Sequence, residues 1–218
     1  MDVVSSMQNG SGPSVDCIQL KFDYISSNPG RTLRMMERLS CPAVSVSVLP
    51  GAALAGGCNG ILAFASTLNR LGSAFRDGGR RLLFHHHHFE FLRFDGELGL
   101  DLLVRETDPC LVGFVVDSYW AQRGGSNPAS LIRRLAGRVG GVHLRDYALR
   151  PALRNFVPDL LPVDAAVREG NLDIPAIIEA CRATGVRYLA IEQDTKDPFG
   201  SIAKSIVNLK ALGFGSLF

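Results

Sequence analysis

The most informative stretch for the fold and the chemistry of this chain is residues 81–91, Arg-Leu-Leu-Phe-His-His-His-His-Phe-Glu-Phe. Apolar residues lead into four consecutive histidines, and the whole chain has only five. A strand over Leu82 to His87 would place His85 and His87 on one face, because side chains alternate along a strand. Two imidazoles would then project together where the strand leaves its buried part. Imidazole is a common metal ligand and the usual proton carrier near neutral pH.

This histidine run has two simpler interpretations, an exposed polar segment and an affinity tag. A tag stands at a terminus beside small polar residues. Here the run stands inside the chain, with Phe84 before it and Phe89 after it. The apolar and aromatic flanks favour a functional site at the end of a buried strand.

Length and composition describe one globular domain over residues 1–218, with 46% hydrophobic and 20% charged residues. A net charge of +2 with scattered arginines gives no surface for nucleic acid. Five cysteines without a C-x-x-C pair fit a reducing compartment better than a disulfide framework. The N-terminus has no signal-peptide pattern, and no apolar run approaches the roughly 20 residues of a membrane span. We therefore expect a cytoplasmic protein with no membrane partner.

Strand and helix patterns alternate along the chain. Apolar and β-branched runs predict six strands, over residues 15–22, 43–49, 81–87, 111–116, 139–144 and 187–191. Helical spacing predicts helices over residues 31–39, 61–75, 98–106, 129–136, 173–184 and 201–212. We expect a flexible lead-in over residues 1–14 and a long irregular loop from about residue 145 to about residue 171.

This alternation predicts parallel strands covered by helices, in an open doubly wound sheet or a closed (β/α)8 barrel. His85, Asp117, His143 and Glu192 stand at the C-terminal ends of successive predicted strands. In a barrel these ends surround one mouth, whereas in an open sheet they lie in a row about 5 Å apart per strand. The four positions therefore favour a TIM-type barrel, of which about six βα units are recognisable.

Two imidazoles and two carboxylates form a ligand set that suits Mn²⁺, Co²⁺, Zn²⁺ or Fe²⁺ better than Ca²⁺. Each residue also has a simpler interpretation. Asp117 could cap a loop, His143 could be a core histidine with satisfied hydrogen bonds, and Glu192 could pair with an arginine. Four such residues on consecutive strand ends favour a metal site, because buried ionisable groups must be paired or metal-bound.

Several segments match a known pattern in order and spacing: residues 83–91, 112–120 (Val-Gly-Phe-Val-Val-Asp-Ser-Tyr-Trp), 131–139, 141–147 (Gly-Val-His-Leu-Arg-Asp-Tyr), 169–173 and 189–194 (Leu-Ala-Ile-Glu-Gln-Asp). Over roughly residues 58–214 the chain resembles the sugar phosphate isomerase/epimerase family, whose members have a xylose isomerase-like TIM barrel. The resemblance implies one divalent metal ion (Mn, Co, Zn or Mg), with the ligands His85, Asp117, His143 and Glu192.

The resemblance also implies an isomerase or epimerase that acts on a small-molecule sugar substrate. A base would remove the proton α to a carbonyl and form an enediolate, and the metal would act as a Lewis acid. Loss of a β-hydroxyl from the same enediolate would make the enzyme a dehydratase, which is the alternative function. The candidate residues are His87, Glu90 and Glu192 for catalysis, and Trp120, Arg145 and Asp146 for substrate binding.

Three features depart from the family pattern. Many relatives have glutamate at the position of His85, which disfavours a mechanism with two metal-bound glutamates. Arg168 stands where a glycine often precedes the Glu-Gly pair. A barrel of this type takes about 250 residues or more, so we expect a part to be missing at the N-terminus. A truncation, a covering partner such as a second copy, or an unrecognised strand within residues 1–30 would account for it.

Two other functions compete with this prediction. The abasic-site endonucleases share the barrel but bind several zinc ions, and they need a histidine where this chain has Trp120. They also need an Asp-x-His after the His143 strand, where this chain has no histidine. A catalytically impaired barrel remnant is the second competitor, and the short N-terminal part motivates it.

Overall fold

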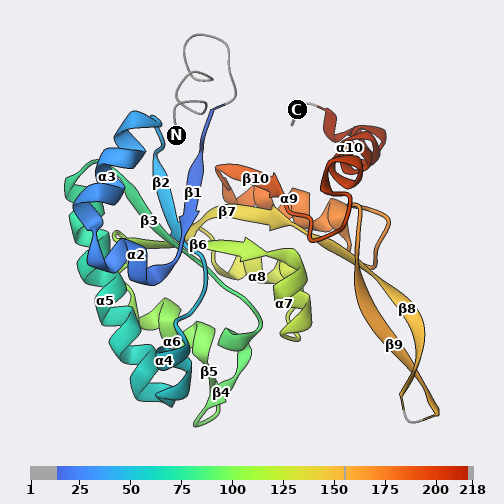
Figure 1. The fold of residues 1–218 in the computed structure, drawn as a ribbon, viewed down its shortest axis with the longest axis horizontal. Helices are drawn as coiled ribbons and strands as arrows, with labels where there is room; N and C mark the ends of the chain where they lie inside the picture. Colours follow the sequence, from blue (N-terminus) through green and yellow to red (C-terminus); the bar gives the residue numbers. More distant parts are fainter. Residues whose placement is uncertain (1–13, 155, 216–218) are drawn as a thin grey trace. The chain divides into compact units, whose positions relative to one another are not determined.

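The computed structural model describes residues 14–154 and 156–215. Its main sheet has six strands in the order β1-β2-β3-β6-β7-β10 (Figure 1). These are β1 (Cys17–Leu20), β2 (Ala43–Val46), β3 (Arg81–His85), β6 (Val112–Asp117), β7 (Val139–Leu144) and β10 (Tyr188–Ile191). The registers of β1 with β2, β2 with β3, β3 with β6 and β7 with β10 are all parallel. All six strands expected from the sequence are present.

Nine α-helices occur in the described part of the chain. They are α2 (Phe22–Ser27), α3 (Pro29–Arg38), α4 (Gly51–Ala55), α5 (Gly57–Asp77), α6 (Gly99–Glu106), α7 (Ser118–Arg123), α8 (Pro128–Arg134), α9 (Ile174–Thr184) and α10 (Pro198–Leu209). The six predicted helices are confirmed. The sequence missed α2, α4 and α7, which have five or six residues each and are too short to show a helical period. None of the described helices is both long and apolar enough to cross a membrane.

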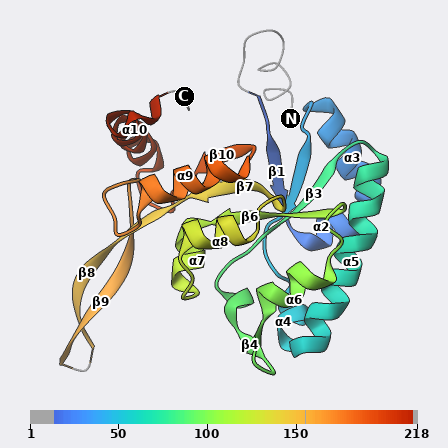
Figure 2. The ribbon, with the colours of Figure 1, turned by 180° about the vertical axis from the view of Figure 1, so that it is seen from behind.

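The chain divides into two compact units, Met1–Val115 and Val116–Phe218. In the first unit, α3 and α5 lie side by side (Figures 1 and 2). Helix α5 buries the apolar stripe that its spacing predicted. Phe64 of that helix meets Phe84 of β3 edge-on at 5.4 Å, and Phe84 meets Phe114 of β6 at 6.4 Å. These aromatic contacts join α5 to two neighbouring strands and form the centre of this core.

In the second unit, β7 is buried along its whole length, and α8 packs against α9. Both helices begin where the sequence indicated. Asn127 Oδ1 accepts the Ser130 N–H at 2.9 Å, and Asp173 Oδ1 accepts the Ala176 N–H at 3.0 Å. Each cap satisfies a backbone donor in the first helical turn.

The predicted irregular loop after β7 was wrong. Its greater part is an antiparallel hairpin of β8 (Asp146–Arg154) and β9 (Val157–Ala165), which extends away from the helices of the second unit (Figures 1 and 2). Three prolines in these strands disguised them, because proline usually marks the end of a strand. A two-stranded hairpin has two outer edges, where a missing N–H breaks no ladder hydrogen bond.

Two smaller hairpin strands, β4 (Arg93–Phe94) and β5 (Glu97–Leu98), and the 3₁₀ turn Phe89–Phe91 were also not predicted. Three strand ends were placed too late in the chain, and one of them is that of β2, which ends at Val46 rather than Leu49. β1 stops at Leu20 because Phe22 already begins α2, and β3 stops at His85 rather than His87. Of the expected lead-in, residues 1–13 lie outside the described residues.

Asp146, the first residue of β8, organises the return of the chain after the hairpin. Its fully buried carboxylate accepts the N–H groups of Tyr147, Arg168, Gly170 and Leu172 at 2.8–3.1 Å. Burial raises the pKa of Asp146, and the four N–H donors oppose that rise. Four backbone donors on one side chain hold residues 168–172 against the base of the hairpin.

Arg168 occupies the left-handed region, with φ of 77°, and its side chain is exposed. An L-residue there costs roughly 1–2 kcal/mol, while glycine adopts this conformation freely. We expect Arg168→Gly to raise the free energy of unfolding by about 0.5–1 kcal/mol, since glycine also loses more chain entropy on folding. Urea unfolding measures the change. Arg168→Ala is the matched control and should give no gain, because alanine keeps the strain; an equal gain from both variants would contradict this explanation.

Candidate metal centre

The first residue of the centre, Asp117, ends β6 and is completely buried. Its Oδ1 accepts the N–H of Trp120 at 2.7 Å and so caps α7. Its Oδ2 lies 3.9 Å from Nδ1 of His143. The capping role considered for Asp117 is therefore real, but it uses only one of the two carboxylate oxygens.

His143, near the end of β7, lies between two carboxylates. Its Nδ1 is 2.6 Å from Oε2 of Glu192, the residue that follows β10. The backbone N–H of Glu192 continues the ladder by donating to Leu144 O at 3.2 Å. His143 is 8% exposed, and the side chain of Glu192 is one-third exposed. The parallel register of β7 and β10 thus brings an imidazole and a carboxylate together from positions 49 residues apart in the sequence.

Asp117, His143 and Glu192 each offer one ligand atom, and these atoms lie within 4.8 Å of one another. Bonds from zinc to imidazole and carboxylate ligands are about 2.0–2.2 Å long, so the ligand atoms of one ion are separated by roughly 3–4.5 Å. Small side-chain rotations would bring the three atoms into this range. Two carboxylates around one imidazole also make a donor set with the negative charge that a divalent cation requires. The residues present therefore fit a divalent metal.

Arg145, directly after β7, connects this group to other carboxylates. Its Nε lies 3.0 Å from Asp164 Oδ1, its Nη1 3.3 Å from Glu192 Oε1, and its Nη2 3.6 Å from Asp194 Oδ2. The guanidinium also lies over the ring of Trp120, at 5.3 Å from the ring centre. The alternative considered for Glu192, an ion pair with an arginine, is thus present as well. It engages Oε1, while Oε2 faces His143.

Three polar residues of this region escaped the sequence reasoning. Ser118 is fully buried; its Oγ accepts the Arg145 N–H at 2.9 Å and lies 3.0 Å from His143 O. It ties the start of α7 to the end of β7. Asp164 and Asp194 lie in segments that were expected to be loops, so no strand-end pattern singled them out.

The histidine run belongs to the first unit. His85 is the last residue of β3, and its Nδ1 lies 3.1 Å from the carbonyl oxygen of Ser47. A carbonyl only accepts hydrogen bonds, so Nδ1 carries the proton and Nε2 is the nitrogen with metal-binding character. Metal-bound histidines commonly donate their other ring nitrogen in this way. His86 is also buried, and its ring is stacked beside that of His85 with the ring centres 6.5 Å apart.

His87 lies beyond the end of β3, so strand alternation does not set its direction. Its ring nevertheless meets that of His85 edge-on at 4.7 Å. The backbone N–H of His87 donates to Oε2 of Glu90 at 2.8 Å. Glu90 is completely buried, and this burial raises its pKa from 4.5 to about 7, although the His87 N–H acts in the opposite direction. Both candidate bases thus lie in one short turn after β3.

Trp120 is half-buried, Arg145 is held among carboxylates, and Asp146 is enclosed by backbone N–H groups. Asp146 therefore has a structural role in the loop that follows the hairpin. The substrate-binding roles of these residues remain predictions, as do the catalytic roles of His87, Glu90 and Glu192.

No family model matches the chain. The inosose dehydratase of Clostridium beijerinckii is 30% identical over 111 residues, which cover 51% of this chain and 36% of that protein. The inosose dehydratase of Lacticaseibacillus casei is 27% identical over 142 residues, which cover 62% of this chain and 47% of that protein. The matched part is thus between about a third and a half of these relatives' length.

Solved structures identify the fold. A sugar phosphate isomerase/epimerase from Parabacteroides distasonis matches 98% of this chain and 76% of its own, with a TM-score of 0.77 and 19% identity. A xylose isomerase-like TIM barrel protein from Mycobacterium smegmatis, in complex with magnesium, matches 95% of this chain and 75% of its own, with a TM-score of 0.67 and 12% identity. The chain has the xylose isomerase-like TIM barrel fold. The predicted fold class is confirmed.

Two further solved structures that match this chain have informative names. The IOLI protein with a binding zinc atom matches all of this chain and 82% of its own, with a TM-score of 0.66 and 14% identity. The probable 3-DHS dehydratase AsbF from Bacillus anthracis matches 90% of this chain and 76% of its own, with a TM-score of 0.71 and 10% identity. These likenesses extend the comparison to proteins whose names include a metal or a dehydratase.

The raised pKa of Glu90 predicts a pH-dependent stability. Between pH 4.5 and about 7 the folded protein keeps a proton that the unfolded chain has lost, so the free energy of unfolding falls as pH rises. Glu90 contributes about 3 kcal/mol to this fall, because each pKa unit is worth about 1.4 kcal/mol. Above about pH 7 its contribution is constant. We expect Glu90→Gln, which keeps an acceptor for the His87 N–H, to flatten the decline.

Urea unfolding at a series of pH values from about 4.5 to about 8 measures this slope. Glu37→Gln changes an exposed glutamate of α3 and serves as the matched control, with the wild-type slope expected. A Glu90→Gln profile parallel to that of the wild type would mean that Glu90 titrates normally in the folded protein.

Proposed function

We propose that this chain carries the metal site of a lyase that removes water from a keto-inositol or a related keto-sugar. The observation that carries the proposal is the group of Asp117, His143 and Glu192, whose ligand atoms lie within 4.8 Å of one another. The 27–30% identity to inosose dehydratases supports dehydration in particular, and a structural neighbour is also named as a dehydratase. Isomerisation or epimerisation of a sugar is the second candidate, supported by the name of a neighbour of the same fold.

We further propose His85 as the fourth ligand of one Mn, Co, Zn or Mg ion. His85 pairs in register with Val115, and Asp117 follows two residues later on the same strand. Both side chains therefore belong to the C-terminal ends of adjacent parallel strands. The hydrogen bond from Nδ1 of His85 to Ser47 leaves Nε2 as the ligand atom. When bound, such an ion supplies Lewis acidity toward a carbonyl or hydroxyl oxygen.

The candidate bases for the proton transfer, His87 and Glu90, lie in the turn after β3. His87 or Glu90 takes the proton from the carbon α to the carbonyl, and the electron pair of that C–H bond forms an enediolate. The enediolate then re-forms the carbonyl and a C=C bond, and the β C–O bond breaks. The departing hydroxide takes up a proton and leaves as water. A carboxyl group with a pKa of about 7 is suited to both accepting and returning a proton near neutral pH.

The other predicted residues act on the substrate and on Glu192. The half-buried ring of Trp120 offers a flat apolar surface to a sugar or inositol ring. Arg145 holds Oε1 of Glu192 and so directs Oε2 toward the metal group. We propose that Glu192 both binds the metal and contacts the reacting oxygens, while Asp146 acts only through the loop that it holds.

Metal content tests the ligand assignment. We expect the purified chain to bind one equivalent of Mn, Co, Zn or Mg, measured by plasma mass spectrometry after equilibration with each ion. Glu192→Ala and His143→Ala should each lower the affinity by more than about 100-fold, because they remove a direct ligand, while even outer partners are worth 10–100-fold. Asp194→Asn is the matched control, since it changes another carboxylate near Arg145 that lies outside the group. Failure to bind any of the four ions would favour the impaired remnant.

Dehydration is tested by incubating the metal-loaded chain with a keto-inositol, a ketose and a 3-keto-glycoside in deuterated water. We expect a keto-inositol product lacking one water, detected by mass spectrometry, and a loss of about 10²–10⁴-fold in Glu90→Gln or His87→Gln if that residue is the base. Glu179→Gln, on the exposed face of α9, should behave as the wild type. Deuterium exchange without loss of water would favour the isomerase or epimerase, and no exchange with any compound would contradict both.

A further inference from the structure

The outer part of the β8–β9 hairpin, beyond the Tyr147–Asp164 pair at its base, has one apolar face. Residues directly opposite each other in an antiparallel pair share a face, and alternate pairs of this hairpin each join a leucine to a proline. These pairs are Leu149–Pro162, Pro151–Leu160 and Leu153–Pro158, and all six side chains are exposed. Leu153 is the most exposed of the leucines, at 75%. We call these six residues the Leu–Pro face.

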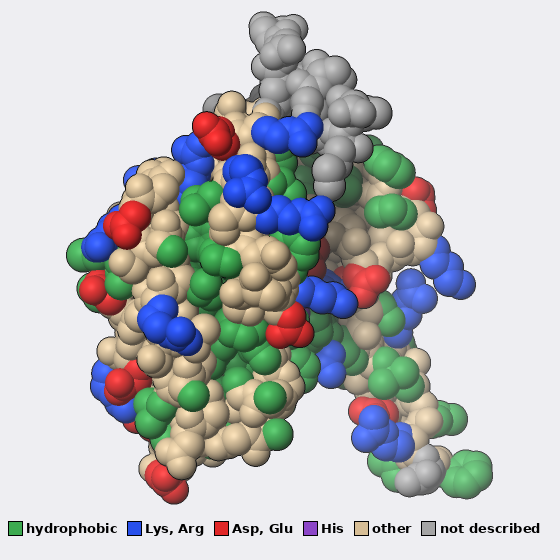
Figure 3. Space-filling model, turned by 60° about the vertical axis from the view of Figure 1, so that its left-hand side comes forward, with side chains coloured by type: hydrophobic (Ala, Val, Ile, Leu, Met, Phe, Trp, Pro, Cys, Tyr) green, Lys and Arg blue, Asp and Glu red, His purple; other side chains and the backbone are tan. Residues whose placement is uncertain are grey.

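The charged residues of this outer part lie on its other face, while Asp164 is at the base of the hairpin and pairs with Arg145. The intervening pairs include Arg150–Leu161, Ala152–Asp159 and Arg154–Val157. Arg154 and Asp159 pair across the strands at 3.2 Å. Figure 3 shows hydrophobic side chains along the projecting hairpin at its lower right. The segregation of charge to one face of this outer part leaves the six residues of the Leu–Pro face as an exposed apolar surface of the second unit.

The prolines also protect the outer edges of the hairpin. Tyr147 belongs to the same alternate set of positions, and its carbonyl points outward to accept the Asn171 N–H at 2.7 Å. Backbone groups at Pro151, Pro158 and Pro162 therefore point outward too, where each proline removes an N–H. An edge that lacks these donors is a poor template for an added strand. A partner would therefore cover the face rather than extend the sheet.

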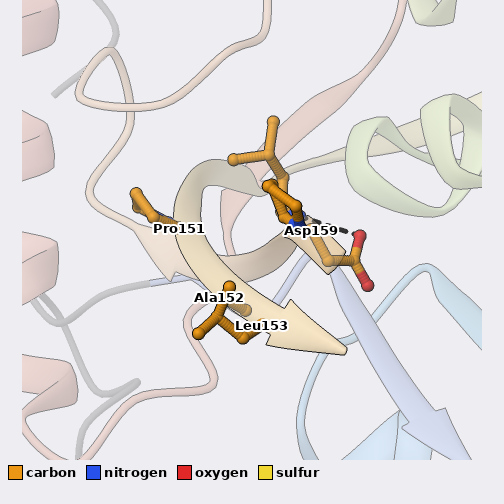
Figure 4. Close-up of a pocket in the computed structure, with 6 residues that line it drawn as sticks. Pro151, Ala152, Leu153 and Asp159 are labelled. Carbon is orange, nitrogen blue, oxygen red and sulfur yellow. Dashed lines mark hydrogen bonds between the residues drawn. The ribbon is translucent and has the colours of Figure 1, made fainter. Parts of the chain in front are cut away.

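The alternation of leucine and proline makes the Leu–Pro face complementary to itself. Along each strand and across each pair, a leucine is always next to a proline. Two copies can turn their Leu–Pro faces toward each other about a two-fold axis that runs parallel to the hairpin strands, midway between the two faces. In this arrangement every leucine of one copy lies over a proline of the other copy. The arginines and aspartates then stay on the outer surfaces. Pro151, Leu153, Pro158 and Leu160 line a shallow, open hollow of about 790 Å³ together with Ala152 and Asp159 of the other face (Figure 4).

We propose that two copies of this chain associate through the Leu–Pro face. A closed two-fold contact satisfies both faces at once, since the same residues serve on each copy. The net charge of +2 opposes association only weakly. An exposed apolar patch of this kind covers on the order of a few hundred Å². The contact belongs to the small, transient class of interfaces.

Sedimentation velocity of the 218-residue chain, from low micromolar to several hundred micromolar, tests the proposal. We expect a monomer–dimer equilibrium that Leu160→Asp shifts to monomer over the whole range, weakening association by at least about tenfold. Leu161→Asp is the matched control, because the neighbouring leucine is similarly exposed, at 47% against 54%, but lies on the opposite face. It should leave the equilibrium unchanged. Circular dichroism checks that both variants are folded.

Four results would overturn the proposal. The first is a wild-type chain that stays monomeric at all concentrations. The second is a dimer that persists in Leu160→Asp, because association would then use another surface. The third is an equal loss of association in Leu160→Asp and Leu161→Asp, because the contact would then not belong to one face of the hairpin. The last is wild-type binding to phosphatidylcholine vesicles that Leu160→Asp abolishes, since the Leu–Pro face would then serve a lipid surface.

Discussion

Charge pairing around Arg145 is the interaction on which the second unit depends. A guanidinium that is almost fully buried is costly unless it is paired and hydrogen-bonded. Asp164 of β9, and Glu192 and Asp194 of the loop after β10, surround it. Glu192 in turn faces His143. The pairing therefore stabilises a buried charge, and it also directs the carboxylate of Glu192 toward an imidazole near the end of the neighbouring strand β7.

The same pairing joins the candidate site to the hairpin. Asp164 lies near the end of β9, and Asp146 begins β8, so both strands of the hairpin are anchored beside β7. Asp146 holds the following loop through four N–H groups. The segment that carries the projecting hairpin is thus firmly attached at its base. Its exposed part is free of these constraints, and the Leu–Pro face lies there.

The turn after β3 shows a second form of the same constraint. Burial raises the pKa of the Glu90 carboxyl to about 7, although backbone N–H donors and His85 act in the opposite direction. Asp117 is equally buried, but its two oxygens have different tasks, one as a helix cap and one toward His143. The simpler interpretations, a cap for Asp117 and an ion pair with an arginine for Glu192, are therefore each correct for one of the two carboxylate oxygens. A cap or an ion pair uses one carboxylate oxygen and leaves the second for another partner.

The sequence by itself determined the six strands, most of the helices, and the residues at the strand ends. Those features depend on local periodicity, capping residues and β-branched runs, which a single chain displays without its partners. Only the tertiary structure decided the surroundings of Arg145, the role of Ser118, the burial of Glu90 and the hairpin with its apolar face. Each of these depends on contacts between residues far apart in the chain, or on a strand register that pairs prolines with leucines. Local patterns do not encode such contacts. Proline and aspartate in a sequence predict a loop, and only the pairing with a second strand shows that the segment is part of a hairpin.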